Sequence, residues 1–425
     1  MASGEPVSRL LYLAKTISTS VAKIEEALSA EGTPLPSFDE DSSFKLPPTI
    51  TRDREAVLDA TAELHDLLLE PLSLINTHAG INNSTCLQAI AEFNIADMVP
   101  PNGRTTFGEI AKQTPMTENM TARILRHAMT MRVFHEPESG FVAHTAASKA
   151  LYQSANNVWL SVITKEMWPA ATKVVEALAK WPDSQEANQT GYSLSKNSEE
   201  TIYAITAKDA DTAARWARGM AVMAQRPQLQ LSHVTNNYDW ASLGEAQVVD
   251  VGGAHGHVAM ALAREFTNLS VVVQDMGKVI QKCTAPEDLQ GRIRFMAYDF
   301  FTSQPVKGAE VYFFRLIFHN WSDKYCGMII RGLIPALKPG ARVIVQDMVM
   351  PEPGTIALWK ERELRATDLT VASVFNSKER TVADFKALFE EVDSSFVLGN
   401  VIEPAGSALG MLEFVWEGSK KRDIN

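Results

Sequence analysis

The chain has 425 residues, which is enough for two or three domains with a sizeable buried core. Hydrophobic residues make up 45% and charged residues 21%, so a disordered, fibrous or disulfide-stapled protein is excluded. The formal net charge of −11 argues against a polyanion as the main partner, and we expect no binding of nucleic acid.

Cysteine usage and hydropathy indicate where the chain works. Cys86, Cys283 and Cys326 are odd in number, widely spaced and without a neighbouring histidine cluster, so we expect neither a disulfide framework nor a metal site. A reducing, cytoplasmic location fits them best. No apolar run approaches the roughly 18 residues that span a bilayer, because even VYFFRLIF contains Arg315, and no membrane attachment is expected.

Residues 1–50 are predicted to form one helix and a linker. Apolar residues recur mostly at three- and four-residue steps, at Leu10, Leu11, Leu13, Ile17, Val21, Ile24 and Leu28. The segment from Thr33 to Thr49 collects Pro, Ser and acidic residues, as linkers do. Either the rest of the chain or a second copy could cover this apolar stripe, and the sequence leaves both open.

Residues 51–155 are predicted to form helices that break near Pro71 and Gly80, followed by a winged-helix pattern. That pattern is a short helix, a turn, a longer helix and a hairpin around Pro137 to Gly140. The longer helix carries Arg123, Arg126 and Arg132. Because the chain is acidic and lacks a basic arm, packing or dimerisation is favoured over DNA binding.

Residues 151–240 have a helical pattern that is unusually rich in Trp and Met, including Trp168, Trp216 and Met220. Such residues belong mostly to a core. Some of them could instead line a pocket for a flat organic ligand, because methionine fits irregular shapes and aromatic faces stack.

After Leu243 short β-branched or aromatic runs alternate with helical stretches. The runs QVVDVGG, LSVVVQD, RIRFMAYD, AEVYFFR and ARVIVQDM are predicted strands. This alternation predicts an α/β fold with a parallel sheet covered on both faces. Ligands of such sheets bind just beyond the carboxyl ends of the strands.

Side chains suited to a nucleoside follow three of these strands. Gly252, Gly253 and Gly256 form a tight turn without the pattern of a pyrophosphate loop. Asp275 ends the next strand, near the offset at which an acid binds ribose hydroxyls. Asp299 and Phe300 end the third and offer a carboxylate for an amine and a ring for a base. Together they indicate adenosine without phosphates.

The fourth strand leads into Arg315 and His319, which places a cation and an imidazole at the same edge of the sheet. Histidine has the unperturbed pKa, about 6.5, that best suits proton removal near neutral pH. A lone histidine is more often structural, and from the residues alone both roles stay open.

In order and spacing, the motifs VVDVGGAHGH, VVVQDMGKVI, MAYDFF, FFRLIFHNWSD, VIVQDMVMPEPG and NSKERT resemble those of plant caffeate-type and fungal sterigmatocystin-type O-methyltransferases. The resemblance covers most of the chain. It implies a Rossmann-like class I methyltransferase domain with a mostly parallel seven-stranded sheet, preceded by helices and a winged-helix dimerisation domain. It also implies S-adenosyl-L-methionine as cofactor, S-adenosyl-L-homocysteine as product, and a homodimer built from the N-terminal helices.

The resemblance assigns site residues by position. It implies a cofactor site of Gly252, Gly253, Asp275, Met276, Asp299, Phe300 and Arg315, the last at the place of a family lysine. His319 matches the general base, and Asp347 and Glu379 match the two acids that flank it. Trp168, Trp216, Met220 and Asn376 are the expected substrate contacts.

Three positions depart from the family pattern. Ala254 replaces a glycine of the turn, Asn320 replaces the acid that follows the base, and Asp347 is one methylene shorter than the usual glutamate. We therefore expect a looser or water-mediated contact between Asp347 and His319.

The expected function is methylation of a hydroxyl, phenolic or enolic, on a small aromatic or polyketide-like molecule. One alternative is a pericyclase or dehydratase that keeps the methyltransferase fold, and another is a non-enzymatic winged-helix regulator. Three parts are expected: helix and linker over 1–50, the dimerisation domain over 51–155, and over 156–425 a helical substrate-pocket segment with the methyltransferase domain.

Overall fold

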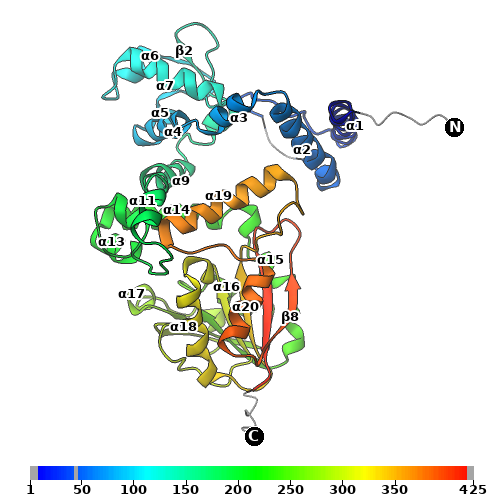
Figure 1. The fold of residues 1–425 in the computed structure, drawn as a ribbon, viewed down its shortest axis with the longest axis vertical. Coiled ribbons are helices and arrows are strands. Elements are labelled where there is room, and N and C mark those ends of the chain that lie inside the picture. Colours follow the sequence, from blue (N-terminus) through cyan, green and yellow to red (C-terminus); the bar gives the residue numbers. More distant parts are fainter. Residues whose placement is uncertain (1–7, 43–45, 419–425) are drawn as a thin grey trace, which may run out of the picture. The chain divides into compact units, whose positions relative to one another are not determined.

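The structure, a computed structural model, describes residues 8–42 and 46–418 (Figure 1). The chain divides into two compact units, and each is described by itself. The first runs to Trp168 and includes residues 214–219 and 353–364, and the second holds the remainder. The three-part division expected from the sequence stays a prediction.

The first unit is mainly helical. Its helices are α1 (Arg9–Ala30), α2 (Thr51–Leu67), α3 (Pro71–His78), α4 (Asn82–Glu92), α5 (Ile95–Met98), α6 (Phe107–Ala111), α7 (Glu118–Thr130), α8 (Ala146–Lys149) and α9 (Asn156–Val162). The predicted breaks are confirmed, because Pro71 begins α3 and Gly80 precedes α4. A π-helical turn, Ile163–Met167, follows α9 and was not predicted.

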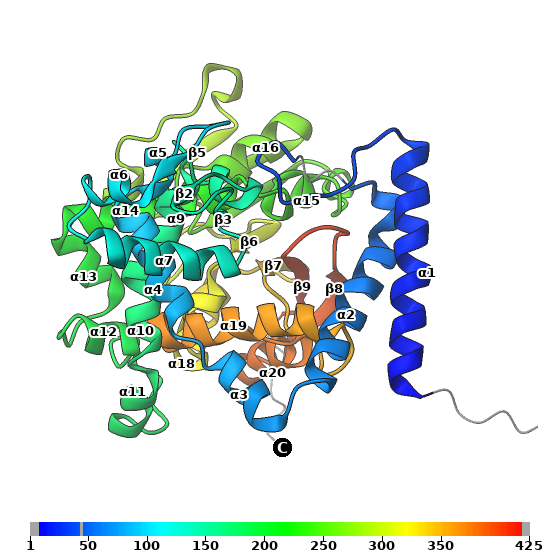
Figure 2. The same cartoon turned by 90° about the horizontal axis from the view of Figure 1, so that it is seen from above.

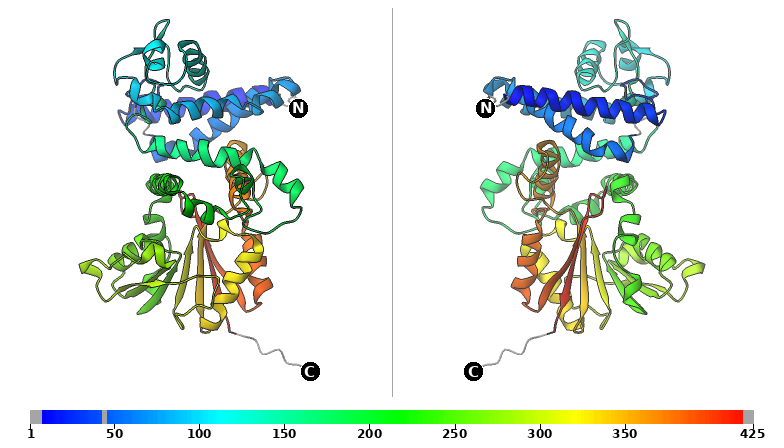
Figure 3. Two further views of the ribbon diagram at one scale, coloured as in Figure 1. Left: turned by 90° about the vertical axis from the view of Figure 1, so that its left-hand side faces the viewer. Right: turned by 90° about the vertical axis from the view of Figure 1, so that its right-hand side faces the viewer.

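Helix α1 lies along α2 (Figures 2 and 3). Leu13 and Leu28 of its apolar stripe are buried, whereas Leu11 and Val21 stay exposed. The chain itself therefore covers only part of the stripe.

The winged-helix pattern is present in outline. α6 and α7 are the predicted short and longer helices. The hairpin around Pro137 to Gly140 is joined by one bridge, between His135 and Ala143, and β2 (Phe141–Val142) pairs with β1 (Thr105–Thr106). Arg126 of α7 forms an ion pair with Glu136 at 2.7 Å, so its guanidinium is engaged within the unit.

The second unit is built on a seven-stranded sheet in the order β5-β4-β3-β6-β7-β9-β8. The strands are β3 (Ala246–Val251), β4 (Leu269–Asp275), β5 (Ile293–Ala297), β6 (Val311–Arg315), β7 (Ala341–Asp347), β8 (Phe396–Ile402) and β9 (Gly410–Trp416). The five strands predicted from apolar runs are all present and parallel to one another, and β9 is antiparallel to both of its neighbours.

Helices cover both faces of this sheet (Figures 1 and 3). The later helices are α10 (Trp168–Ala171), α11 (Val174–Lys180), α12 (Gly191–Ser195), α13 (Ile202–Lys208), α14 (Ala210–Ala224), α15 (Ser232–Thr235), α16 (His257–Glu265), α17 (Gly277–Ile280), α18 (Asp323–Leu333), α19 (Leu358–Phe375) and α20 (Val382–Val392). Residues 214–219 of α14 and 358–364 of α19 belong to the first unit. Successive strand residues point to opposite faces of the sheet, so they belong to two different cores. Val249 packs with α18 and α20 on one face, and Val248 packs with α15 and α16 on the other. Burial on both faces explains the near-continuous apolar runs.

Strand β3 lies between β4 and β6, so the order of strands reverses direction at β3. The carboxyl ends of the five parallel strands share one edge of the sheet, and a ligand site is expected at such a reversal point. No helix in the described residues is long and apolar enough to cross a membrane.

Candidate active site

The turn after β3 needs glycine for two different reasons. Gly252 has φ +76°, a left-handed conformation that glycine adopts without strain. A Cβ atom on Gly253 would lie 2.4 Å from the carboxylate of Asp250. The backbone nitrogens of both glycines donate to the carbonyl oxygen of Gln274, at 2.8 and 3.1 Å, so the turn is fixed against β4.

Asp275, at the end of β4, is held by its surroundings with part of its carboxylate still accessible. One oxygen accepts from the backbone nitrogen of Ala254 at 3.0 Å, and the other from that of Met276 at 2.7 Å. Each carboxylate oxygen has two lone-pair sites, so both can accept a further hydrogen bond, for instance from a ribose hydroxyl.

Asp250 lies beside the glycine turn and was not among the predicted site residues. It is buried at the end of β3, and its Oδ2 has no partner within the described ranges. Burial raises the pKa of Asp250 to about 7, nearby Arg315 opposes the rise, and Asp275 adds to it. A buried orphan oxygen beside a glycine turn fits a ligand that brings a positive charge, as the ammonium of a methionine moiety does. An acid two residues before the glycine pair was the only signal in the sequence.

The segment after β5 brings an aromatic ring to the turn. The ring of Phe300 would lie 4.0 Å from a Cβ atom on Gly252, so the two predicted cofactor residues are adjacent. Asp299 is exposed, and its Oδ1 accepts from the backbone nitrogen of Phe301 at 3.0 Å. Its other oxygen remains for a ligand.

Trp321 sits at the centre of an aromatic cluster that was not predicted. Its ring stacks on Tyr203 at 5.5 Å between centroids and meets Phe301 edge-on at 4.7 Å. Phe300 contacts it edge-on at 5.9 Å. Flat, apolar walls of this kind suit a base or an aromatic acceptor.

The guanidinium of Arg315 forms hydrogen bonds with two groups of the protein. It donates to Oε1 of Gln346 at 2.6 Å and to the carbonyl oxygen of Leu229 at 2.7 Å. Burial lowers the pKa of Arg315, while Asp250 and Asp347 oppose that fall. Its positive charge therefore interacts with both carboxylates.

His319 and Glu379 form a direct pair. Nδ1 of His319 lies 3.0 Å from Oε1 of Glu379, and the two side chains are 19% and 1% exposed. A carboxylate only accepts, so Nδ1 is the donor. In the neutral imidazole the lone pair is then on Nε2, which has no hydrogen-bond partner among the residues that the structure describes.

Asp347 acts on the backbone beside the imidazole. Its Oδ2 accepts from the backbone nitrogen of Phe318 at 3.0 Å, and its Oδ1 has no partner among the described residues. Burial raises the pKa of Asp347 to about 7, with His319 opposing and Glu379 adding to the rise.

The protonation of His319 reflects these neighbours. Burial disfavours the imidazolium, but the hydrogen bond with Glu379 and the charges of Asp347 and Glu379 outweigh burial and raise the pKa of His319. The ring is therefore a stronger base than an exposed histidine.

The four predicted substrate contacts fall in different units. Trp168 and Trp216 belong to the first unit, and Nε1 of Trp216 is buried without a partner in the described chain. Met220 and Asn376 belong to the second. The amide nitrogen of Asn376 donates to the carbonyl oxygens of Ser184 and Glu186, at 2.9 and 3.2 Å.

Across residues 8–42 and 46–418 no group of three or more His, Cys, Asp or Glu side chains could hold a metal ion. The three cysteines are free.

The fold and the matched family define the class of the protein, a class I methyltransferase that uses S-adenosyl-L-methionine. Two family descriptions match the chain: an O-methyltransferase domain over residues 179–393 and an O-methyltransferase dimerisation domain over residues 75–154. The chain belongs to the O-methyltransferase family and is an S-adenosyl-L-methionine-dependent enzyme, which sets aside the non-enzymatic regulator.

Named relatives extend over nearly the whole chain. O-methyltransferase PaMT of Phomopsis amygdali is 41% identical and covers 96% of this chain and 97% of its own. The grayanic acid biosynthesis cluster O-methyltransferase of Cladonia grayi is 36% identical, with 97% and 88% covered. Chlorophenol O-methyltransferase of Trichoderma longibrachiatum is 33% identical, with 98% and 92% covered.

Solved structures share the fold. OxaC in complex with S-adenosyl-L-homocysteine (SAH) and oxaline has a TM-score of 0.74 at 21% identity and covers 96% of this chain and 100% of its own. A structure described as a pericyclic reaction enzyme has a TM-score of 0.70 at 21% identity, with 95% and 100% covered. One architecture thus occurs with different names and ligands, and the fold alone does not select a reaction.

Proposed function

We propose that this enzyme methylates a phenolic or enolic hydroxyl of a small natural-product molecule, with His319 as general base. The observation that carries the proposal is the His319–Glu379 pair, which follows β6 at the sheet edge where the glycine turn and Asp275 also lie. This pair leaves Nε2 of the imidazole free to accept a proton.

Bound S-adenosyl-L-methionine supplies an electrophilic methyl group on a sulfonium. Asp275 would accept the ribose hydroxyls, Gly252 and Gly253 would let the backbone approach, and Asp299 with Phe300 would take the adenine. The orphan oxygen of Asp250 supports this assignment, because a cationic group would give it a partner. Met276 and Arg315 complete the proposed cofactor site.

The base makes the acceptor hydroxyl a better nucleophile. A phenol has a pKa near 10, so most of it keeps its proton at neutral pH. Nε2 of His319 would take that proton, and Glu379 would stabilise the resulting imidazolium. Asp347 would hold the backbone at Phe318 and add negative charge. A positioned base contributes roughly 10² to 10⁴ in rate.

A phenolic acceptor is supported by the name of one relative, a chlorophenol O-methyltransferase. Trp168, Trp216, Met220 and Asn376 are proposed to contact it.

We also propose a homodimer, on the strength of the matched dimerisation domain.

The free cysteines are consistent with the reducing, cytoplasmic location that the sequence predicts.

A screen by mass spectrometry tests the reaction. The enzyme is incubated with cofactor and a panel of substituted phenols and polyketide-like enols, a chlorinated phenol among them. A product heavier by one methylene supports methyl transfer, whereas an isomer or a product that has lost water supports the pericyclase or dehydratase alternative. Asp275→Ala should abolish binding of SAH in calorimetry, and unchanged binding would refute the cofactor assignment.

A further inference from the structure

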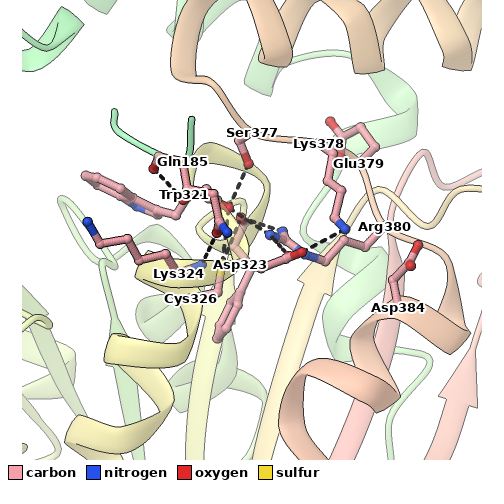
Figure 4. A network of polar contacts seen from close by, with 12 residues as sticks. Gln185, Trp321, Asp323, Lys324, Cys326, Ser377, Lys378, Glu379, Arg380 and Asp384 are labelled. Carbon is pink, nitrogen blue, oxygen red and sulfur yellow. Dashed lines mark hydrogen bonds and ion pairs between the residues drawn. The ribbon is translucent and has the colours of Figure 1, made fainter. Parts of the chain in front are cut away.

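Arg380 follows Glu379 in the chain, and its side chain is 0% exposed. Its Nη1 donates to the carbonyl oxygen of Phe318 at 2.9 Å, and its Nη2 donates to that of Trp321 at 2.8 Å. Nε and Nη2 also donate to Oδ1 of Asp323, at 3.0 and 2.7 Å (Figure 4). One guanidinium thus contacts the segment 318–323 at three residues.

These contacts lie on both sides of the proposed base. Phe318 directly precedes His319 in a short 3₁₀ turn, Phe318–Asn320, and Trp321 directly follows that turn. The hydroxyl of Ser377 donates to the same carbonyl of Trp321 at 2.7 Å. Ser377 and Arg380 lie on either side of Glu379, and their hydrogen bonds hold its segment against the segment that carries His319 (Figure 4).

Net stability is a poor account of this arrangement. The carboxylate of Asp323 is 45% exposed, so solvent screens its attraction for the guanidinium and the pair adds little to the free energy of unfolding. The planar fork of arginine does provide donors in fixed directions, which a lysine cannot do. The guanidinium therefore serves to fix the positions of the groups that it contacts.

We propose that Arg380 is a positioning residue for the general base, clamping the 318–323 segment so that the His319 imidazole stays in register with Glu379. The inference rests on the proposed function of His319 and deepens it. Arg380 contacts no reacting atom in this account.

Two effects of Arg380 on His319 have opposite signs, and this makes the proposal testable. The groups that act on the imidazole are Glu379, Asp347 and Arg380. The positive charge of Arg380 lowers the pKa of His319, so losing that charge alone would raise it. Loosening the hydrogen bond with Glu379 would lower the pKa instead.

The experiment compares Arg380→Met and Arg380→Lys with the wild type, and uses Lys378→Met as control. Lys378 is half exposed and pairs with the same Asp323 at 2.8 Å, but it holds no carbonyl of the base segment among the described contacts. The measurements are the His319 pKa by NMR of histidine-labelled protein, SAH binding by calorimetry, and kcat and KM with the best phenol of the panel.

Arg380→Met should lower the His319 pKa and reduce kcat on the order of 10²-fold, because a small misplacement of reacting groups costs that much. SAH affinity should stay within about twofold, since Arg380 makes no contact in the proposed cofactor site. Arg380→Lys should recover part of kcat, and Lys378→Met should match the wild type.

A raised or unchanged His319 pKa in folded Arg380→Met, or an unchanged kcat, would overturn the proposal. If Arg380→Met does not fold, Asp323→Asn replaces it, because this variant weakens the grip on the guanidinium and keeps the arginine. The same fall in pKa is then expected, and no fall would overturn the proposal. Full activity in His319→Ala would instead remove the proposed base, while the NMR measurement would still report whether Arg380 positions the ring.

Discussion

The carboxylates around His319 decide at which pH its imidazole can accept a proton. Glu379 bonds the ring directly, and Asp347 bonds the backbone next to it. The family resemblance predicted all three as catalytic residues. It could not show that the shorter Asp347 bonds a peptide nitrogen, because that depends on how the turn after β6 is folded.

Methylation by the wild type should fall at acid pH with a midpoint above the ordinary histidine pKa of about 6.5. The raised pKa of His319 means that the imidazole holds its proton to higher pH than an exposed histidine. In Glu379→Gln the negative charge is lost while burial remains, so the midpoint should move to lower pH. We expect kcat to fall roughly 10-fold to 100-fold. A pH profile of kcat/KM is the measurement, and an unmoved acid limb would contradict the assignment.

The raised pKa of Asp250 predicts that cofactor binding is linked to proton release. Its pKa of about 7 leaves it partly protonated near neutral pH, and an arriving cationic group would lower that pKa. Affinity for S-adenosyl-L-methionine should therefore rise as the pH increases through 7. Calorimetry in buffers of different ionisation enthalpy should detect release of a fraction of a proton, and Asp250→Asn should abolish it.

Two variants are controls for this linkage. His319→Ala removes a nearby group whose pKa is also raised, and Asp347→Asn removes the other buried carboxyl with a pKa raised to about 7. Proton release that persists in both controls and vanishes in Asp250→Asn supports the account. Proton release that vanishes in His319→Ala and persists in Asp250→Asn would show that His319, and not Asp250, is linked to cofactor binding.

Among the elements, the five parallel strands could be predicted because burial on both faces makes each a run of apolar residues. β8 and β9 could not be predicted from residue patterns. The turn-forming pair Gly399 and Asn400 interrupts β8, where the register shifts, and β9 carries Glu413 within it. Glu413 is tolerated because Tyr238 and Asn400 donate to its carboxylate. Tyr238 is distant in sequence and Asn400 lies on the neighbouring strand, so the pattern of residues in β9 gave no sign of either partner.

The same limit applied to the site. The glycine turn and Asp275 could be predicted because each follows directly from the end of a strand. The stack of Trp321 on Tyr203 and the contacts of Arg380 join separate segments, and only the folded chain shows them.

Phe385 and Phe389 of helix α20 pack against the ring of Phe318, and α20 begins with a capping box. The hydroxyl of Thr381 accepts from the backbone nitrogen of Asp384 at 3.0 Å, and the carboxylate of Asp384 accepts from the backbone nitrogen of Thr381 at 2.9 Å. Thr381→Ala should lower the free energy of unfolding by about 1 kcal/mol, measured by urea titration. Thr381→Ser keeps the hydroxyl and should recover most of this loss, whereas equal losses in both variants would show that the cap is not the cause.

At the scale of the whole molecule, large apolar side chains that are exposed on the single chain support the proposed dimer. Ile75 and Ile81 lie in the matched dimerisation domain and are 63% and 70% exposed. Large apolar side chains exposed in this way mark interaction surfaces.

Light scattering should give twice the chain mass of 46.8 kDa for the wild type. The double variant Ile75→Glu, Ile81→Glu should shift the mass toward a single chain, because charges buried at an interface are costly. Leu178→Glu alters an equally exposed residue outside that domain and should leave the dimer intact. A double variant that stays dimeric would place the interface elsewhere.

The whole account depends on proton removal by His319. The most direct test is single-turnover transfer of an isotope-labelled methyl group from S-adenosyl-L-methionine to a phenol, compared between the wild type and His319→Ala. We predict label on the acceptor oxygen in the wild type and a rate lower by about 10² to 10⁴ in the variant, with SAH binding retained. An unchanged rate in His319→Ala, or turnover that never moves the label, would contradict it.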